Sequence, residues 1–151
     1  MNKDLEFVKF DEIYLEKSWE WLNDVELKKL TNTPDFTREQ QRIFYDSLPR
    51  QDYKVWGMEF KKKPIGVVGF KKITNSDLEY FGYIGEKNYW GKGFFTHIQN
   101  FILDEARKLA VDLIYLHVCN DNERAIRAYQ REGFIVSENN GNMVKMTMRV
   151  I

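Results

Sequence analysis

The segment Asn88-Tyr-Trp-Gly-Lys-Gly-Phe-Phe95 joins a strand-like stretch to a helix-like one, and this junction limits the folds open to the chain. Residues 77–84 before it resemble a strand, and they follow two further strand-like segments at 52–60 and 64–73. After it, apolar residues recur at steps of three and four, which predicts an amphipathic helix over 95–109. Three successive strands followed by a helix favour an α+β fold over repeated βαβ units.

The first half of the chain predicts one further strand, two helices and a hairpin. Residues 5–10 alternate apolar and polar side chains as a short strand does, and 11–24 have helical spacing with Asp11 as a candidate N-cap. The Thr-x-x-Gln pattern at 37–40 has the form of a capping box, which predicts a second helix. The lysine-rich segment 61–64 lies between two strands and predicts a hairpin turn, with a phosphate-binding role as the alternative.

The second half predicts a strand, a helix and a closing hairpin. The strand covers 113–118, and the helix over 122–132 is ended by Gly133. Residues 134–137 and 143–150 predict two strands around Asn140-Gly141. The expected order is β-α-α-β-β-β-α-β-α-β-β, an α+β fold with a mixed, mostly antiparallel sheet covered by helices.

The composition predicts one soluble globular domain over residues 1–151. Hydrophobic residues make up 43% of the chain, and its 23 basic and 23 acidic residues balance. The totals therefore favour neither a nucleic-acid partner nor a membrane. The first ten residues lack the apolar core of a signal peptide, and the single cysteine, Cys119, cannot form an internal disulfide. We therefore expect a cytoplasmic protein.

Gly91 and Gly93 flank Lys92 in the turn before the predicted helix. Glycine lets backbone N–H groups converge, because no Cβ restricts φ or blocks approach. With a helix N-terminus directly behind it and a lysine beside it, such a turn can hold a phosphate. The lysine position does not fit a Walker loop, and Thr96 interrupts a dinucleotide fingerprint. On this motif alone, a phosphate site and a tight turn without a ligand are equal alternatives.

A second motif lies after the strand at 113–118, and the two motifs together resemble the GNAT superfamily of acetyl-CoA-dependent N-acetyltransferases. That family shows Arg/Gln-x-x-Gly-x-Gly/Ala after its fourth strand and Asn-x-x-Ala-x-x-x-Tyr-x-x-x-Gly-Phe after its fifth. The matching residues here are Asn88, Gly91, Gly93, Asn122, Ala125, Tyr129, Gly133 and Phe134. The likeness spans nearly the whole chain and includes the branch with ribosomal-protein N-terminal and nucleotide-amino-sugar acetyltransferases. Asn88 departs from the family's Arg or Gln and has less reach toward a pyrophosphate.

The resemblance implies acetyl-CoA as the acetyl donor and names the residues that would hold it. Its pantetheine arm would lie at the end of the fourth strand, beside Ile84, Gly85 and Glu86. Its pyrophosphate and reactive end would be held by Asn88, Gly91, Lys92, Gly93, Phe94, Phe95, Thr96 and Asn122. Tyr129 takes the position of the family's general acid, and a phenol with a reference pKa of about 10 can protonate a departing thiolate. The alternative for Tyr129 is a core tyrosine anchored by one hydrogen bond.

Two residues compete for the role of general base, and the sequence does not decide between them. His117 lies on the strand before Asn122, and an imidazole with a reference pKa of about 6.5 can accept a proton near neutral pH. Glu79 lies near a carboxylate that serves as base in other relatives, but alignment with the family puts Tyr80 in that place. A shift of one residue turns a strand side chain to the other face of the sheet. A water relay, or an amine that arrives neutral, is the third alternative.

The resemblance implies transfer to a primary amine, and we expect a small-molecule acceptor such as a nucleotide-linked amino sugar. Protein N-terminal acetylation, a non-catalytic acyl-CoA-binding module and a structural domain without ligand are the other hypotheses. The aromatic residues expected in the core, with some lining the acceptor side as the alternative, are Trp19, Trp21, Tyr45 and Trp56. We expect no metal, because His97 and His117 lack further ligands at suitable spacing. Dimers are common in the family, and the C-terminal hairpin offers an edge for a homodimer.

Overall fold

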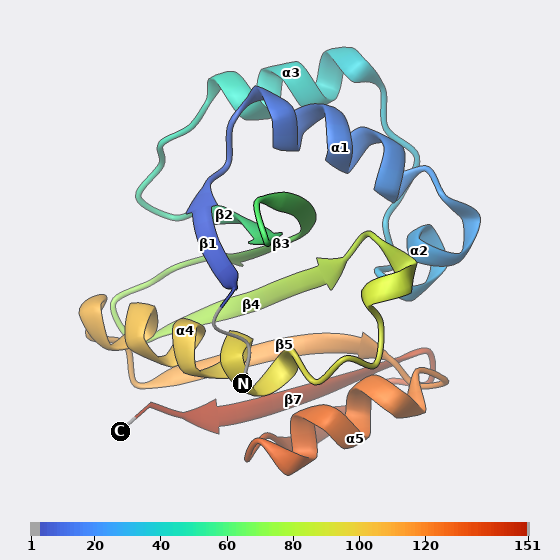
Figure 1. The fold of residues 1–151 in the computed structure, drawn as a ribbon. Helices are drawn as coiled ribbons and strands as arrows, with labels where there is room; N and C mark the ends of the chain where they lie inside the picture. Colours follow the sequence, from blue (N-terminus) through green and yellow to red (C-terminus); the bar gives the residue numbers. More distant parts are fainter. Residues whose placement is uncertain (1–3, 151) are drawn as a thin grey trace.

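The computed structural model describes residues 4–150, which form one seven-stranded sheet with helices on both faces (Figure 1). The strands are β1 (Leu5–Lys9), β2 (Lys54–Phe60), β3 (Lys63–Lys71), β4 (Asp77–Ile84), β5 (Leu113–Cys119), β6 (Ile135–Asn139) and β7 (Met143–Arg149). The helices are α1 (Glu12–Leu22), α2 (Val25–Leu30), α3 (Arg38–Asp46), α4 (Phe95–Lys108) and α5 (Glu123–Arg131), with a 3₁₀ turn at Lys87–Tyr89. The spatial order is β1-β2-β3-β4-β5-β7-β6, and only β4 and β5 are parallel neighbours. The predicted α+β fold with a mostly antiparallel sheet is confirmed.

The structure contains one more helix than the sequence predicted. Residues 11–24 were expected to form one helix, but α1 ends at Leu22 and a separate helix, α2, begins at Val25. Asp24 between them has an extended backbone, and its carboxylate accepts a hydrogen bond from the Leu27 N–H at 3.1 Å. This N-cap restarts the chain as a new helix. No helix within residues 4–150 is long and apolar enough to cross a membrane.

Both predicted hairpins are confirmed. Lys61 and Lys62 lie at the turn between β2 and β3, with left-handed φ angles of 50° and 71°. Gly141, with a φ of 81°, lies at the turn between β6 and β7. β6 is an edge strand on which Ile135 and Val136 are 66% and 46% exposed. A homodimer through this edge stays a prediction.

β4 and β5 pair over three residues only, Asp77–Glu79 with Leu113–Tyr115. Beyond this point β4 stays paired with β3 as far as Ile84, and β5 stays paired with β7 as far as Cys119. The two parallel strands therefore diverge in the middle of the sheet (Figure 1). Backbone groups that no longer pair with a neighbouring strand need other partners, so this divergence is a suitable place for a ligand.

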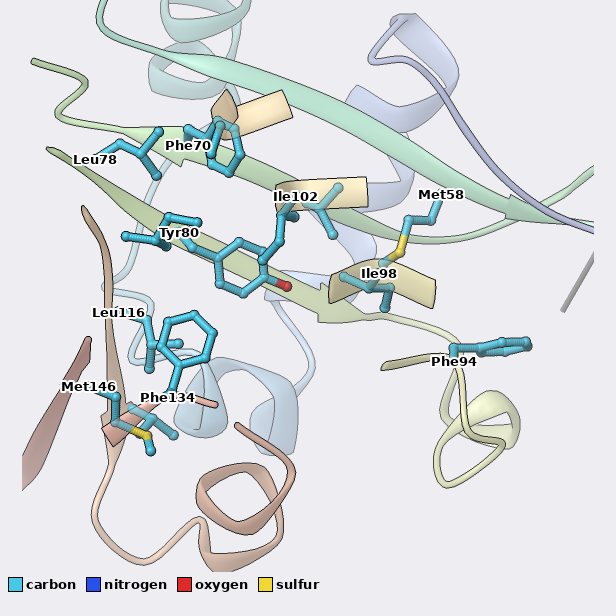
Figure 2. Close-up of a cluster of buried hydrophobic side chains, with 14 of the residues drawn as sticks. Met58, Phe70, Leu78, Tyr80, Phe94, Ile98, Ile102, Leu116, Phe134 and Met146 are labelled. Atoms are coloured by element: carbon cyan, nitrogen blue, oxygen red, sulfur yellow. The ribbon is translucent and has the colours of Figure 1, made fainter. Parts of the chain in front are cut away.

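Each face of the sheet has its own hydrophobic cluster, because side chains alternate along the strands. On β3, Val67 packs with Tyr14 and Trp21 of α1, whereas the next residue, Val68, packs with Ile102 of α4. Figure 2 shows the cluster on the α4 side, which includes Tyr80 of β4. The two layers of helices are thus fixed to opposite faces of one sheet.

Most of the aromatic residues expected in the core lie there. Trp21 is buried in the α1 cluster, Tyr45 packs against the same cluster, and Trp56 packs against the cluster on the α4 side. Trp19 is half-buried on α1, where the Arg38 guanidinium lies 4.6 Å from the centre of its ring. None of these four residues lines the central cavity described below.

α3 is attached to α1 mainly through polar contacts. The Arg42 guanidinium donates two hydrogen bonds of 2.8 Å to the Glu12 carboxylate, and Arg38 donates to Glu16 at 2.6 and 3.1 Å. Gln41 donates to the Leu15 carbonyl at 2.8 Å. No residue of α3 is fully buried. Bidentate pairs of this kind give geometric specificity, so they set the orientation of α3 against α1.

Ile102→Ala tests the packing on the α4 side, where Ile102 is fully buried. We expect the free energy of unfolding to fall by about 2–5 kcal/mol, because the lost side chain leaves a cavity in a close-packed core. Ile13→Ala is the control, since Ile13 is 59% exposed on α1, and a change within about 0.5 kcal/mol is expected there. Urea denaturation followed by circular dichroism measures both, and equal effects would contradict the described packing.

Candidate active site

A cavity of about 980 Å³ lies where β4 and β5 diverge. Its wall combines residues of the two strands with residues from α1, α2, α3 and α5. The cavity therefore connects the α1–α3 side of the sheet with the α5 side through the opening between the strands. A ligand threaded through this opening can meet groups from both layers of helices.

The turn before α4 combines two glycines in the left-handed region with the uncapped start of a helix. Gly91 and Gly93 have φ angles of 72° and 79°, in the left-handed region that favours glycine. A Cβ added at Gly93 would meet no atom within 4 Å, so the loop is open on that side. The first N–H groups of a helix have no intrahelical acceptor, and no side chain caps α4. These donors and the positive end of the helix dipole fit a diphosphate.

The side chains around this turn differ in where they point. Lys92 and Asn88 are exposed, whereas Phe94 is buried and the ring of Phe95 packs on Tyr129 at 5.0 Å. The Thr96 hydroxyl donates to the Glu132 carboxylate at 3.0 Å, so it is directed toward α5. At Phe94, Phe95 and Thr96, the groups suited to an anion are therefore backbone N–H groups.

The strand end predicted to contact pantetheine is already partly hydrogen-bonded within the chain. The N–H groups of Gly85 and Glu86 donate to the Ile65 carbonyl at 2.7 and 3.2 Å. The Ile84 carbonyl accepts from the Trp90 indole at 2.8 Å and, as a carbonyl oxygen, has a second lone pair. An amide arm lying here can therefore donate to Ile84, while the two N–H groups are engaged.

Tyr129 lies on α5 and lines the cavity. Its ring packs edge-on against Phe95, Phe134 and Tyr80, with centroids 5.0, 5.6 and 6.4 Å away. Burial raises the pKa of Tyr129 to about 12, so the phenol is protonated at neutral pH. Within residues 4–150, no hydrogen bond to its hydroxyl occurs. The hydrogen bond expected for an anchored core tyrosine is therefore absent among the described residues.

Asn122 also lines the cavity, and it has a clear local role. Its side-chain oxygen accepts from the Ala125 N–H at 3.3 Å, as the N-cap of α5. Capping fixes the start of the helix that carries Tyr129.

The two competing base candidates, His117 and Glu79, are hydrogen-bonded to each other. His117 Nδ1 lies 2.9 Å from Glu79 Oε2, and both residues line the cavity. Glu79 is only 6% exposed, and its Oε1 lies 3.7 Å from Lys72 Nζ but has no hydrogen-bond partner in the described chain. When Nδ1 donates to the carboxylate, the second imidazole nitrogen, Nε2, keeps its lone pair and can accept a proton.

The strand register explains why Glu79 reaches the site. Glu79 and Lys71 are opposite one another on β4 and β3, and both line the cavity. Tyr80, the next residue, packs in the α4-side cluster against Tyr129, and burial raises the pKa of its phenol. The side chains of the neighbours Glu79 and Tyr80 therefore lie on opposite faces of the sheet.

An aromatic wall lines the α3 side of the cavity, and none of its three members is among the four aromatic residues named individually from the sequence for the core or the acceptor side. Phe44 of α3 packs on Tyr53 at 5.0 Å, and Tyr53 packs on Phe81 of β4 at 5.5 Å. Phe81 follows Glu79 by two residues, so strand alternation is the signal that could have identified it. Contact between α3 and Tyr53 depends on tertiary packing, for which the local sequence has no signal.

The cavity wall contains few charged groups. Among its described residues, Glu79 is the only carboxylate, and Lys71 and His117 are the only basic side chains. His97 packs on Phe7 instead, at 5.8 Å, and Cys119 lies beside the Lys29 carbonyl with a pKa raised mainly by burial. Residues 4–150 contain no cluster of three His, Cys, Asp or Glu side chains that could hold a metal ion.

Solved structures share this fold. The spermidine N-acetyltransferase from Vibrio cholerae, in complex with CoA and spermine, matches with a TM-score of 0.88 and 21% identity over 99% of this chain and 97% of that one. The N-acetyltransferase PseH of Campylobacter jejuni, in complex with acetyl coenzyme A, matches with a TM-score of 0.75 and 19% identity over 96% of this chain and 98% of that one.

The sequence itself carries the family assignment. Acetyltransferase PseH of Campylobacter jejuni subsp. jejuni serotype O:23/36 (strain 81-176) is 26% identical over 138 residues, which cover 90% of this chain and 86% of that protein. The model of the acetyltransferase (GNAT) family matches residues 16–134, a range that includes the glycine turn, His117 and Tyr129. The resemblance predicted from the two motifs is confirmed, and the chain belongs to the acetyltransferase (GNAT) family.

Proposed function

We propose that this acetyl-CoA-dependent N-acetyltransferase acts on the primary amine of a nucleotide-linked amino sugar. The observation that supports this acceptor best is the charge of the cavity wall, where Glu79 is the only carboxylate among the described lining residues. Its buried Oε1 lies 3.7 Å from Lys72 Nζ but accepts no hydrogen bond, and a buried carboxylate oxygen without a hydrogen bond is costly. One ammonium group of an acceptor would satisfy it.

The rest of the wall suits rings and a phosphate better than further amines. Phe44, Tyr53 and Phe81 present aromatic surface on which a base or a sugar ring can pack. Lys71 supplies a cation beside them, and lysine is a common phosphate ligand. A polyamine would bury several ammonium groups in a cavity with one carboxylate, and an unpaired buried charge is strongly unfavourable.

The donor side of the proposal rests on the turn before α4. Acetyl-CoA supplies the activated acetyl thioester. We expect the turn 91–96, with Lys92 and the uncapped N–H groups at the start of α4, to hold the diphosphate, because there is open space beside Gly93 and no side chain caps α4. The Ile84 carbonyl offers a lone pair to the pantetheine arm, and Asn122 fixes the start of α5 beside the reactive end.

The base and acid roles go to His117 and Tyr129, which lie on different sides of the opening between β4 and β5. His117 Nε2 accepts the proton that the attacking amine loses, while Glu79 Oε2 holds Nδ1 and stabilises the imidazolium. Tyr129 Oη donates its proton to the departing sulfur from the α5 side. In this arrangement Glu79 positions the base, so the two candidates have complementary roles.

An acceptor survey tests the substrate class. A UDP-linked amino sugar should be acetylated with a kcat/KM at least about 100-fold above that of spermidine, a difference of about 2.7 kcal/mol in transition-state binding. Radiolabelled acetyl-CoA with both acceptors, a free amino sugar and peptides with free N-termini provides the measurement. Lys71→Gln should raise KM for the UDP-linked sugar and leave that for the free sugar unchanged. Transfer to peptides alone would refute the proposal in favour of protein N-terminal acetylation.

His117→Gln tests the base. We expect kcat to fall roughly 10²–10⁴-fold, because the group that accepts the proton of the attacking amine is lost. His97→Gln is the matched control, since His97 packs on Phe7 away from the cavity, and its kcat should equal that of the unmodified enzyme. An unchanged kcat in His117→Gln would overturn the role of His117.

Tyr129→Phe separates catalysis from cofactor binding. The substitution removes only the hydroxyl, so calorimetry should show unchanged affinity for CoA while kcat falls roughly 10²–10⁴-fold. The aromatic contacts of the ring with Phe95 and Phe134 are retained, so the fold should not suffer. Full activity of this variant would show that Tyr129 is not the general acid. Binding without turnover in the unmodified protein would identify a non-catalytic acyl-CoA-binding module.

A further inference from the structure

We propose that Arg124 is a second cationic ligand of the donor's diphosphate, and that it replaces the long side chain which the chain lacks at Asn88. This inference rests on the proposed function, in which the turn before α4 holds that diphosphate. It adds a residue from a different helix, α5, to a cradle otherwise built from residues 91–96.

The position of Arg124 is the first argument. A Cβ added at Gly91 would collide with the Arg124 guanidinium, so this group lies directly against the backbone of the turn. Arg124 is the second residue of α5, which begins at Glu123 after the Asn122 cap. A side chain from the first turn of α5 therefore reaches the turn before α4, whereas Thr96 at the start of α4 contacts Glu132 at the other end of α5.

The free hydrogen-bonding capacity of Arg124 is the second argument. Four other arginines bind carboxylates, namely Arg38, Arg42, Arg50 and Arg107. Within residues 4–150, no hydrogen bond or ion pair uses the Arg124 guanidinium, although the side chain touches the turn. A guanidinium has five N–H donors in a planar fork that matches the oxygens of a phosphate. Arg124 thus carries an unpaired positive charge beside the turn that is proposed to hold the diphosphate.

The residue at position 88 is the third argument. Asn88 lies in the 3₁₀ turn Lys87–Tyr89 and is exposed, and its neutral amide is shorter than the Arg or Gln seen in the matching motif. A neutral amide also forms weaker bonds to phosphate than a charged group does. Contact with Gly91 places the Arg124 guanidinium at the glycine turn itself, which favours the diphosphate over the 3′-phosphate of CoA as its ligand.

Titration calorimetry with CoA and with dephospho-CoA, which lacks the 3′-phosphate, tests this assignment. Arg124→Gln should weaken both ligands by the same factor, about 10- to 100-fold, as expected for loss of a charged hydrogen-bonding group. Arg149→Gln is the control for loss of one positive charge, because Arg149 is exposed and pairs with Leu113 at the other end of β5. Its affinity for both ligands should be unchanged.

A compensating variant makes the test sharper. Adding Asn88→Arg to Arg124→Gln should restore at least part of the lost affinity, because it returns a cation to the position that the family motif uses. Melting of each variant without ligand checks that the fold is intact. Unchanged CoA affinity in Arg124→Gln would overturn the inference, and so would a loss confined to CoA, which would assign Arg124 to the 3′-phosphate. Absence of CoA binding by the unmodified protein is a separate result, and it would overturn the proposed donor site as a whole.

Discussion

The end of the pairing between β4 and β5 is the constraint on which the whole site depends. Their ladder stops after Glu79 and Tyr115, although each strand continues along its antiparallel neighbour. Continued pairing would close the sheet and separate the α1–α3 layer from the α4–α5 layer. Because pairing stops, one cavity connects Tyr129 on the α5 side with His117, Glu79 and an aromatic wall on the α3 side.

The bond between His117 and Glu79 spans this same divergence. Glu79 is the last residue of β4 in the parallel ladder, and His117 lies two residues beyond its counterpart on β5. A side-chain hydrogen bond thus joins the strands where the backbone bonds end. It also orients the imidazole, which is how buried carboxylates commonly assist a histidine in proton transfer. The contact that joins the two strands is thus also the one to which we assign the positioning of the base.

Local signals predicted most of the fold, and contacts across the fold account for what was missed. Strand alternation, helical spacing and capping patterns predicted every strand and four of the five helices, while α2 depends on the bond from Asp24 to Leu27. The glycine turn and Tyr129 were predicted because each belongs to a short motif. The meeting of His117 with Glu79 depends on the register of two strands that are far apart in sequence. The aromatic wall and Arg124 depend on helix placement, which periodicity alone does not determine.

The attachment of α3 has a consequence for how such an enzyme can change over evolution. No residue of α3 is fully buried, and two arginine–carboxylate pairs hold it to α1. Yet Gln40, Gln41 and Phe44 line the cavity. Replacement of a partly exposed side chain usually costs little folding free energy. We therefore expect variation along this one helix to change which amine is accepted, while the residues assigned to the donor stay the same.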